Sequence, residues 1–489
     1  MNPFTDGVTN RRTLLAGLGS LLIAGTATAC SPGAGGGAGG PVEITLAGPN
    51  QWNSDGASFG KPWEDLIARF HADEPDIKVT TLVLPLKDFR QTLSTQLSAG
   101  TAPELVFNQA THEPYMVHPL TEALRQPNPY VPGNKAWLDL FDPQYYGPDL
   151  PTSINAVSGD VEFVPFNLVA VGVYFNTEAF EKAGVTAPLA TFADLMAACE
   201  KLTAAGYTPF AMDNSDIGIG WTVKTIANMM LDRYFDQVNV FDSAGKPGKA
   251  ASLSPGGKSW ARAILTGAIS ATGTPEVAES LKLLKQFFDA AATKNWSGVA
   301  SSSGSVVNLR DFLAGTAAMA WGVPFGYGAL DQLAGKVSSM PFPTITKASS
   351  TLSTEAPARF GVSTGGTSYM IPSTLDEAHR GAAIKFLQWM SVAANVQPWL
   401  DATGGLPALK DATAPKGVAG MITGEWSKPM RMGGLPGGPA GTTELSLYDG
   451  YLLGTKSLDQ ELAHLQDLWL KGVKERVKKN KWDSEDWAQ

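Results

Sequence analysis

An α/β fold is predicted by the first hundred residues after position 40, where strand and helix patterns alternate and short loops join them. Residues 42–46 alternate in polarity and include β-branched side chains, which is typical of a strand. Residues 62–71 place apolar side chains at i, i+3, i+4 and i+7 behind Pro62, which predicts an amphipathic helix. A strand, a helix and a third short strand follow at residues 76–84, 89–97 and 104–107. Strands that alternate with helices in this way favour a parallel, doubly wound sheet.

The rest of the chain continues the alternation. A β-rich run covers residues 163–175. A helix is predicted at residues 191–205, because Thr191 is suited to cap it and Asp194 supplies an acid in its first turn. Further helices are expected at residues 222–234, 275–292, 376–393 and 458–478. The 489 residues are too many for one ordinary core, so we expect two or three domains.

The N-terminus has the pattern of an export signal. Arg11 and Arg12 precede a short apolar run at residues 14–24, and the small residues 27–29 directly precede Cys30. The run is too short and too rich in glycine to span a bilayer well. Residues 1–29 resemble a twin-arginine signal with a lipoprotein box. That resemblance implies cleavage before Cys30, lipidation of its thiol and a Gly/Ser-rich tether at residues 30–40. The alternative is a plain secretion signal that leaves Cys30 free.

Composition and charge limit the classes of function. The apolar fraction of 44% and the charged fraction of 17% are typical of an ordered globular protein. The net charge of −9 argues against a nucleic-acid partner and against a basic membrane-binding surface. If Cys30 carries lipid, Cys199 has no disulfide partner in the chain. Cys199 shares a helical face with Leu195 and Leu202, so we expect a buried apolar side chain and not a nucleophile.

Several segments resemble bacterial extracellular solute-binding proteins of carbohydrate ABC transporters. The resemblance covers nearly all of residues 41–480, and it depends on the order and spacing of its parts. The family usually has Asp at the position of Glu104, so this chain departs slightly from the pattern. The matching motifs are Glu74-Pro75-Asp76, Ala99-Gly100-Thr101-Ala102-Pro103-Glu104, Tyr174-Phe175-Asn176-Thr177, Leu313-Ala314-Gly315-Thr316-Ala317-Ala318-Met319 and Thr403-Gly404-Gly405-Leu406-Pro407.

The resemblance implies an α/β, two-lobed periplasmic-binding-protein-like fold with a hinge and an inter-lobe ligand cleft. It implies crossings of the chain near residues 165–167, Lys336 and Ala393. Lobe 1 would then be residues 41–166 plus 335–392, and lobe 2 would be residues 167–334 plus 393–489. The implied protein is a monomeric lipoprotein, anchored to the outer face of the cytoplasmic membrane, that binds a carbohydrate and delivers it to ABC permease subunits. It would need no cofactor and no metal, and it would catalyse no reaction.

Loops that follow strands supply the candidate ligand-binding residues of lobe 1, since ligands of open α/β sheets bind beyond the carboxyl ends of strands. Amides and carboxylates pair with sugar hydroxyls, and aromatic rings stack on sugar faces. The alternative is a polar surface loop with one anchoring tryptophan. The candidates are Asn50, Gln51, Trp52 and Asp55 after the first strand, and Asn108 and Gln109 after the third.

Candidates in lobe 2 and at the crossing strands rest on similar chemistry. Trp221 is expected in a loop before a helix, where it could form a stacking platform. The resemblance implies that an aromatic side chain after residues 317–319 stacks on the sugar; Phe325 fits best and Trp321 could belong to the core. Asn167, at the crossing strand, is a candidate ligand residue; the alternative is a hinge residue whose side-chain amide is hydrogen-bonded to the backbone. The remaining candidates are Gly366 and Thr367, where backbone can approach a ligand, and Glu444.

Enzyme motifs are absent from the sequence. His112, Glu113 and His118 do not have the His-Glu-x-x-His spacing, and Pro114 would break such a helix. No Gly-x-Ser-x-Gly elbow lies between a strand and a helix, and no phosphate-binding loop of the Gly-x-x-x-x-Gly-Lys-Ser/Thr type is present. A glycoside hydrolase stays open, because two distant carboxylates could pair in a cleft. The candidate cleft loops hold no Lys or Arg, which favours a neutral mono- or oligosaccharide over an anionic ligand; another polyol or polar solute is the alternative.

Overall fold

The computed structural model describes residues 40–49, 58–85, 88–242, 245–248, 253–300, 306–333 and 335–489. Pro41–Gln489 forms one compact unit. The predicted export signal at residues 1–29 and Cys30 lie outside the described residues, as does nearly all of the predicted tether.

The first sheet has five strands, in the order β2 (Ile77–Leu84), β1 (Val42–Pro49), β3 (Leu105–Phe107), β9 (Val362–Met370) and β4 (Phe163–Ala170). β1 pairs in parallel with β2 and β3, which confirms the parallel arrangement predicted for residues 42–107. β9 runs antiparallel to both β3 and β4, so the complete sheet is mixed and not wholly parallel. β9 begins more than 250 residues after β3 ends, at the point where the chain returns to the first sheet. No local sequence pattern could therefore predict the direction in which β9 runs.

The second sheet has four strands, in the order β6 (Thr208–Ala211), β7 (Ala317–Gly322), β5 (Gly172–Asn176) and β8 (Val337–Met340). β5 is antiparallel to β7 and β8, whereas β6 and β7 are parallel. Every residue of β5 and β7 is buried, which accounts for their continuous apolar character.

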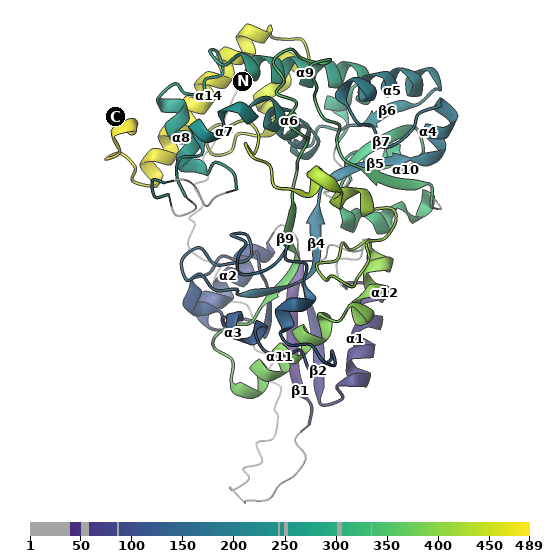
Figure 1. Cartoon of the computed structure of the whole chain (residues 1–489), viewed down its shortest axis with the longest axis vertical. Coiled ribbons are helices and arrows are strands. Elements are labelled where there is room, and N and C mark those ends of the chain that lie inside the picture. The colour runs from purple at the N-terminus through teal and green to yellow at the C-terminus, as the bar shows by residue number, and fades with distance from the viewer. Residues whose placement is uncertain are drawn as a thin grey trace, which may run out of the picture. The chain divides into compact units, whose positions relative to one another are not determined.

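Helices around the first sheet bury the apolar faces that the sequence predicts. In α1 the buried residues are Trp63, Leu66, Ile67 and Phe70, the four positions of the predicted stripe. α11 packs against β1, and α12 packs against α1 (Figure 1). The helices of this first lobe are α1 (Lys61–Asp73), α2 (Phe89–Ala99), α3 (Thr121–Leu124), α11 (Glu377–Met390) and α12 (Ala393–Thr403).

A larger set of helices surrounds the second sheet. It consists of α4 (Thr177–Ala183), α5 (Phe192–Ala204), α6 (Asp216–Met230), α7 (Phe235–Val238), α8 (Gly257–Leu265), α9 (Pro275–Ala291), α10 (Leu309–Leu313), α13 (Glu444–Leu452) and α14 (Leu458–Lys479). Thr191 caps α5 in a capping box with Asp194, as predicted. The start predicted for α6 at Thr222 is wrong, because Ser215 caps the helix through the Gly218 N–H and the helix continues through Gly218 and Gly220.

Short 3-10 helices join these elements. They are η1 (Pro114–Met116), η2 (Trp137–Leu140), η3 (Asp232–Tyr234), η4 (Trp296–Gly298), η5 (Pro324–Leu333), η6 (Ala419–Ile422), η7 (Gly424–Ser427) and η8 (Asp486–Ala488).

The predicted β-rich run at residues 163–175 is two strands that belong to different sheets. β4 ends at Ala170 in the first sheet, and β5 starts at Gly172 in the second. The chain therefore changes sheets at Val171, a few residues beyond the crossing expected at residues 165–167. β4 and β9 lie side by side (Figure 1) and form the connection between the sheets.

The other two expected crossings are also displaced. Residues 335–392 were expected in lobe 1, but β8 pairs with β5 in the second sheet, so the return crossing falls between β8 and β9. Residues from 393 onward were expected in lobe 2, but α12 packs against α1 in the first lobe. Strand pairing and helix packing decide these boundaries, and both depend on contacts between residues far apart in the chain.

Candidate ligand-binding site

A cavity of about 420 Å³ lies where β4 ends and β9 begins. Its walls come from both crossing strands, from α6 and from the loops before α8 and before α13. Apolar side chains predominate, and a few polar groups stand among them, as in small-molecule sites. The lining residues are Thr152, Val169, Ala170, Val171, Trp221, Lys224, Leu253, Ser254, Phe360, Gly361, Val362, Ser363, Pro429, Met430 and Gly433.

Trp221 supplies the largest aromatic surface of this cavity. The ring is half-buried, and it meets Phe360 edge to face at a centroid distance of 6.2 Å and an interplanar angle of 88°. The Trp321 ring also contacts the Trp221 ring, and their centroids lie 6.2 Å apart. Trp221 was predicted in a loop; it lies instead within α6, so its position is fixed by a helix.

Lys224 lies one helical turn beyond Gly220, and Glu444 covers Gly220. The Cγ of Glu444 lies 3.1 Å from the position that a Cβ on Gly220 would occupy, so the glycine makes room for the glutamate. Burial raises the pKa of Glu444; the Lys224 ammonium opposes that rise and the Asp216 carboxylate adds to it. Of these three charged side chains only Lys224 lines the cavity; Asp216 and the predicted ligand residue Glu444 are not part of its wall.

Gln109 joins the first lobe to the crossing strand β9. Its Nε2 donates to the Gly365 carbonyl at 2.6 Å, and its Oε1 accepts from Nη2 of Arg90 at 2.6 Å. The Gly365 N–H in turn donates to Oγ of Ser363, a residue of the cavity wall, at 2.9 Å. A continuous series of hydrogen bonds thus connects α2 with the cavity.

One cationic side chain, Lys224, lines the cavity, and the exposed Arg90 lies outside its wall, bonded to Gln109, although the predicted cleft loops contain no Lys or Arg. Lys224 belongs to α6 and Arg90 to α2. Both residues are therefore on helices, whereas the sequence-based argument for a neutral ligand considered only the loops. The absence of Lys and Arg from those loops therefore does not describe all the charge near the site.

Asn167, Gly366 and Thr367 form the bulge at which β4 crosses β9. Oδ1 of Asn167 accepts the Thr367 N–H at 2.9 Å, and the pairing register shifts on both sides of Asn167. A Cβ on Gly366 would lie 2.9 Å from that same oxygen, so the close contact requires glycine. All three residues are buried, and none lines the cavity.

The remaining predicted residues occupy different positions. Trp321 is fully buried and its Nε1 donates to Oγ1 of Thr222 at 2.8 Å, so the structure places it in the core. Phe325 is half-buried at the start of η5, outside the cavity wall. Asn108 is half-buried, and its N–H pairs with the Ser368 carbonyl at 3.0 Å. Asn50, Gln51, Trp52 and Asp55 lie outside the described residues.

Sequence reasoning missed Lys224, Phe360 and Met430 as wall residues. A signal existed for Lys224: once α6 is started at its Ser215 cap, Gly220, Trp221 and Lys224 fall within one turn of each other. Phe360 and Met430 come from irregular segments on which no periodicity acts, so only the tertiary structure brings them to Trp221.

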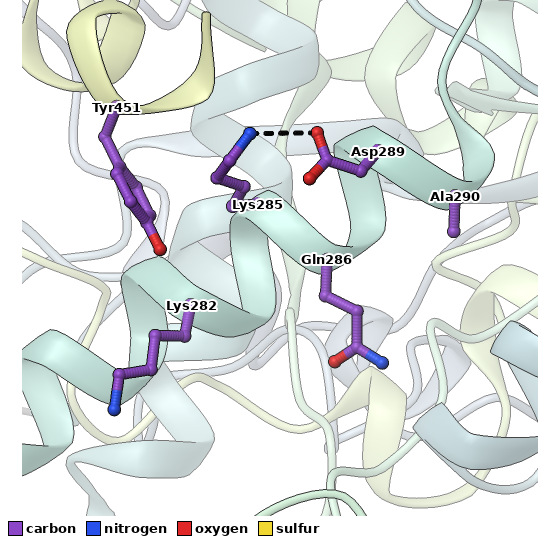
Figure 2. Close-up of a pocket in the computed structure, with 6 residues that line it drawn as sticks. All are labelled: Lys282, Lys285, Gln286, Asp289, Ala290 and Tyr451. Atoms are coloured by element: carbon purple, nitrogen blue, oxygen red, sulfur yellow. Dashed lines mark hydrogen bonds and ion pairs between the residues drawn. The ribbon is translucent and has the colours of Figure 1, made fainter. Parts of the chain in front are cut away.

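A second hollow, of about 560 Å³, lies on the outer surface of α9 and reaches Tyr451 of α13 (Figure 2). Its cations are already paired, since Lys285 contacts Asp289 at 3.0 Å and Lys282 contacts Glu279 at 3.3 Å. Figure 2 shows Tyr451 on α13, whereas the other labelled side chains, Lys282, Lys285, Gln286, Asp289 and Ala290, are spread along α9. This hollow is a solvated helix face and not a candidate site.

The described part of the chain shows neither a metal-binding cluster nor a membrane-spanning helix. No group of three or more His, Cys, Asp and Glu side chains there could hold a metal ion. No helix among those residues has the length and apolar character needed to cross a membrane.

Residues 53–397, more than half of the chain, match the family of bacterial extracellular solute-binding proteins. The chain belongs to this family. Its resemblance to the family, first indicated by the motifs between residues 74 and 407, is confirmed. Membership in a family of extracellular binding proteins implies export.

Curated relatives agree with this assignment. A Brucella abortus (strain 2308) protein described as a binding protein is 27% identical over 194 residues, which are 40% of this chain and 41% of that protein. The chain thus matches well under half the length of these first relatives. The sn-glycerol-3-phosphate-binding periplasmic protein of Shigella dysenteriae is 23% identical over 381 residues, 74% of each chain.

Solved structures confirm the two-lobed fold. A chitin oligosaccharide binding protein aligns with a TM-score of 0.55 and 19% identity, over 89% of this chain and all of that one. The raffinose complex of the solute-binding protein RafE aligns with a TM-score of 0.53 and 17% identity, over 88% and 99% of the two chains. At these identities the likeness establishes the fold of this solute-binding protein and not its ligand.

Proposed function

We propose that this solute-binding protein captures a neutral mono- or oligosaccharide between its two lobes and delivers it to an ABC permease. The observation that carries the proposal is the cavity at the crossing strands, where the half-buried ring of Trp221 faces polar groups. An aromatic face with hydrogen-bonding groups around it is the chemistry that a sugar ring requires. In this proposal Trp221 stacks on the sugar and Glu444 accepts from its hydroxyls.

The charges near the cavity support an uncharged ligand. The Lys224 ammonium lowers the pKa of Glu444, whereas the Asp216 carboxylate raises it. A ligand with hydroxyl groups can donate to a carboxylate and accept from an ammonium, and the charge of Lys224 is partly offset by those of nearby Glu444 and Asp216. The similar structures whose names mention chitin oligosaccharide and raffinose support the same ligand class.

The second candidate ligand is a polar polyol that carries an anionic group. Lys224 and Arg90 favour it, as does the relative named for sn-glycerol 3-phosphate. A glycoside hydrolase is the alternative from a different class, and the relatives described as binding proteins favour binding without catalysis.

The predicted residues that the cavity wall does not include keep roles in this proposal. Asn50, Gln51, Trp52, Asp55, Asn108 and Gln109 would contact the ligand from lobe 1 when the lobes close, and Phe325 from lobe 2. Gly366, Thr367 and Asn167 would shape the hinge. Cys30 would carry the lipid anchor that holds the protein at the outer face of the cytoplasmic membrane.

A thermal-shift screen of the purified chain tests the proposal. The library should contain neutral mono- and oligosaccharides together with sn-glycerol 3-phosphate, and calorimetry should follow each hit. We expect a rise in melting temperature with at least one neutral sugar and none with the phosphate. A shift with the phosphate alone would favour the second candidate, and release of product from chromogenic glycosides would contradict a pure binding function.

A further inference from the structure

Another cavity, distinct from the crossing-strand cavity and from the hollow on α9, opens at the N-terminus of α8 on the second lobe. It has a volume of about 250 Å³, and its wall includes Gly256, Gly257, Ser259 and Trp482. We call it the α8 pocket. The N-cap residue Gly256 has no side chain with which to cap the helix. The first N–H groups of a helix have no partner within it, so this end of α8 offers hydrogen-bond donors.

The Ser259 side chain gives an independent indication of a ligand. Ser259 is only 1% exposed and lines the α8 pocket, yet its Oγ has no hydrogen-bond partner in the described part of the chain. Buried hydroxyl groups in folded proteins nearly always have a partner. A ligand with its own hydroxyl groups, entering the pocket, would supply one.

An aromatic ring completes the wall. Trp482 is half-buried beyond the end of α14, and its ring centroid lies 6.3 Å from that of Trp487. The C-terminal turn that carries both tryptophans is tied to α8, because Nζ of Lys258 contacts Glu485 at 2.6 Å. Trp482 can therefore present a fixed face to a ring in the pocket.

The charges of the α8 pocket favour a neutral ligand. The Lys258 ammonium is held by Glu485, by the Gly245 carbonyl at 2.9 Å and over the Phe241 ring at 4.6 Å. Asp242 adds a carboxylate to the wall. Donors, acceptors and an aromatic face without excess positive charge suit a polyhydroxyl ring and not a phosphate.

We propose that the α8 pocket is a second carbohydrate-binding site, which takes one neutral pyranose ring. The segment 253–259 joins it to the first cavity, since Leu253 and Ser254 line that cavity and Gly256 lines the α8 pocket. The bound ring is therefore either a separate sugar or the distal ring of an oligosaccharide that occupies the first cavity.

Saturation-transfer NMR on the purified chain tests the separate-sugar arm. The probes are the methyl pyranosides of glucose, galactose, xylose and N-acetylglucosamine, with Trp221→Ala as the background that disables the first cavity. We expect at least one probe to retain its signal there, and Ser259→Ala or Trp482→Ala to reduce that signal at least threefold. Trp487→Ala is the matched control: it removes a neighbouring ring that does not line the pocket, and the signal should stay within twofold.

Calorimetry tests the oligosaccharide arm in the otherwise unchanged chain, with raffinose, maltotriose and chitotriose as probes. If the distal ring occupies the α8 pocket, Ser259→Ala and Trp482→Ala should weaken a trisaccharide at least threefold without weakening its monosaccharide. Ser259→Ala keeps the C-terminal turn intact, so its result does not depend on the folding of that turn. The proposal is overturned if neither pocket variant changes any probe in either arm. Binding that Trp221→Ala alone abolishes would leave the proposed transport function standing and remove the second site.

Discussion

At the scale of single residues, two neighbouring tryptophans have opposite expected roles. Trp221 is half-buried in the wall of the first cavity, whereas Trp321 is fully buried against it. Trp221→Ala should weaken binding of the transported sugar by about 1.5–3 kcal/mol, or one to two decades in affinity, because it removes a stacking surface. Calorimetry on variants that still melt cooperatively measures this loss.

Cys199→Ser is the control for that measurement. Burial raises the pKa of the Cys199 thiol to about 12, and the side chain lies on the buried face of α5. We expect its sugar affinity to equal that of the wild type. Wild-type affinity in folded Trp221→Ala would show that the ligand lies elsewhere.

His112 gives a residue-scale prediction for pH. Its Nε2 lies 2.8 Å from the Glu162 carboxylate, and this hydrogen bond raises the pKa of His112 above its ordinary value of 6.5 despite partial burial. The raised pKa means that the contact stabilises fully below pH 6.5 and loses its effect as the pH rises through the folded-state pKa. Urea unfolding of wild type and Glu162→Gln should therefore differ most below pH 6.5. A difference that stays constant from pH 5 to pH 8 would contradict this account.

At the scale of elements, the bulge between β4 and β9 is the feature on which the crossing depends. Asn167→Ala removes the acceptor of the buried Thr367 N–H and should lower the free energy of unfolding by about 1–3 kcal/mol. If Asn167 acts through the strands and not through the ligand, affinity measured on the folded variant should change much less than stability does. A large loss of affinity with unchanged stability would instead assign Asn167 to the ligand.

At the scale of the whole molecule, ligand should make the protein more compact. Two lobes that close about a hinge contact the ligand together only in the closed form, so binding shifts the population toward that form. Small-angle scattering with saturating sugar should give a smaller radius of gyration than scattering without it. Identical curves would count against closure of the lobes.

The proposed anchor is a second property of the whole molecule. Cys30→Ser removes the thiol that lipid would modify, so the mature chain should be released from membranes or remain as precursor. Fractionation of cells that express each form measures this. A variant that partitions with membranes as the wild type does would rule out lipidation at Cys30.

Elements with a local pattern could be predicted from the sequence alone. The stripe on α1, the cap of α5 by Thr191 and the parallel strands of residues 42–107 follow from spacing along a single segment, and the structure has them. The same kind of reasoning selected Trp221 as a candidate, although it misplaced the start of α6. Family membership was also visible in the sequence, because short motifs keep their order even where overall identity is low.

Contacts between distant parts of the chain could not be predicted in this way. The antiparallel entry of β9, the change of sheet at Val171 and the meeting of Trp221 with Phe360 join residues separated by more than a hundred positions. The burial of Trp321 against α6 and the second sheet is a contact of the same kind. Such contacts depend on how the crossing strands β4 and β9 connect the two sheets. The free energy that stabilises them comes from packing between distant segments, and no pattern within one segment predicts that packing.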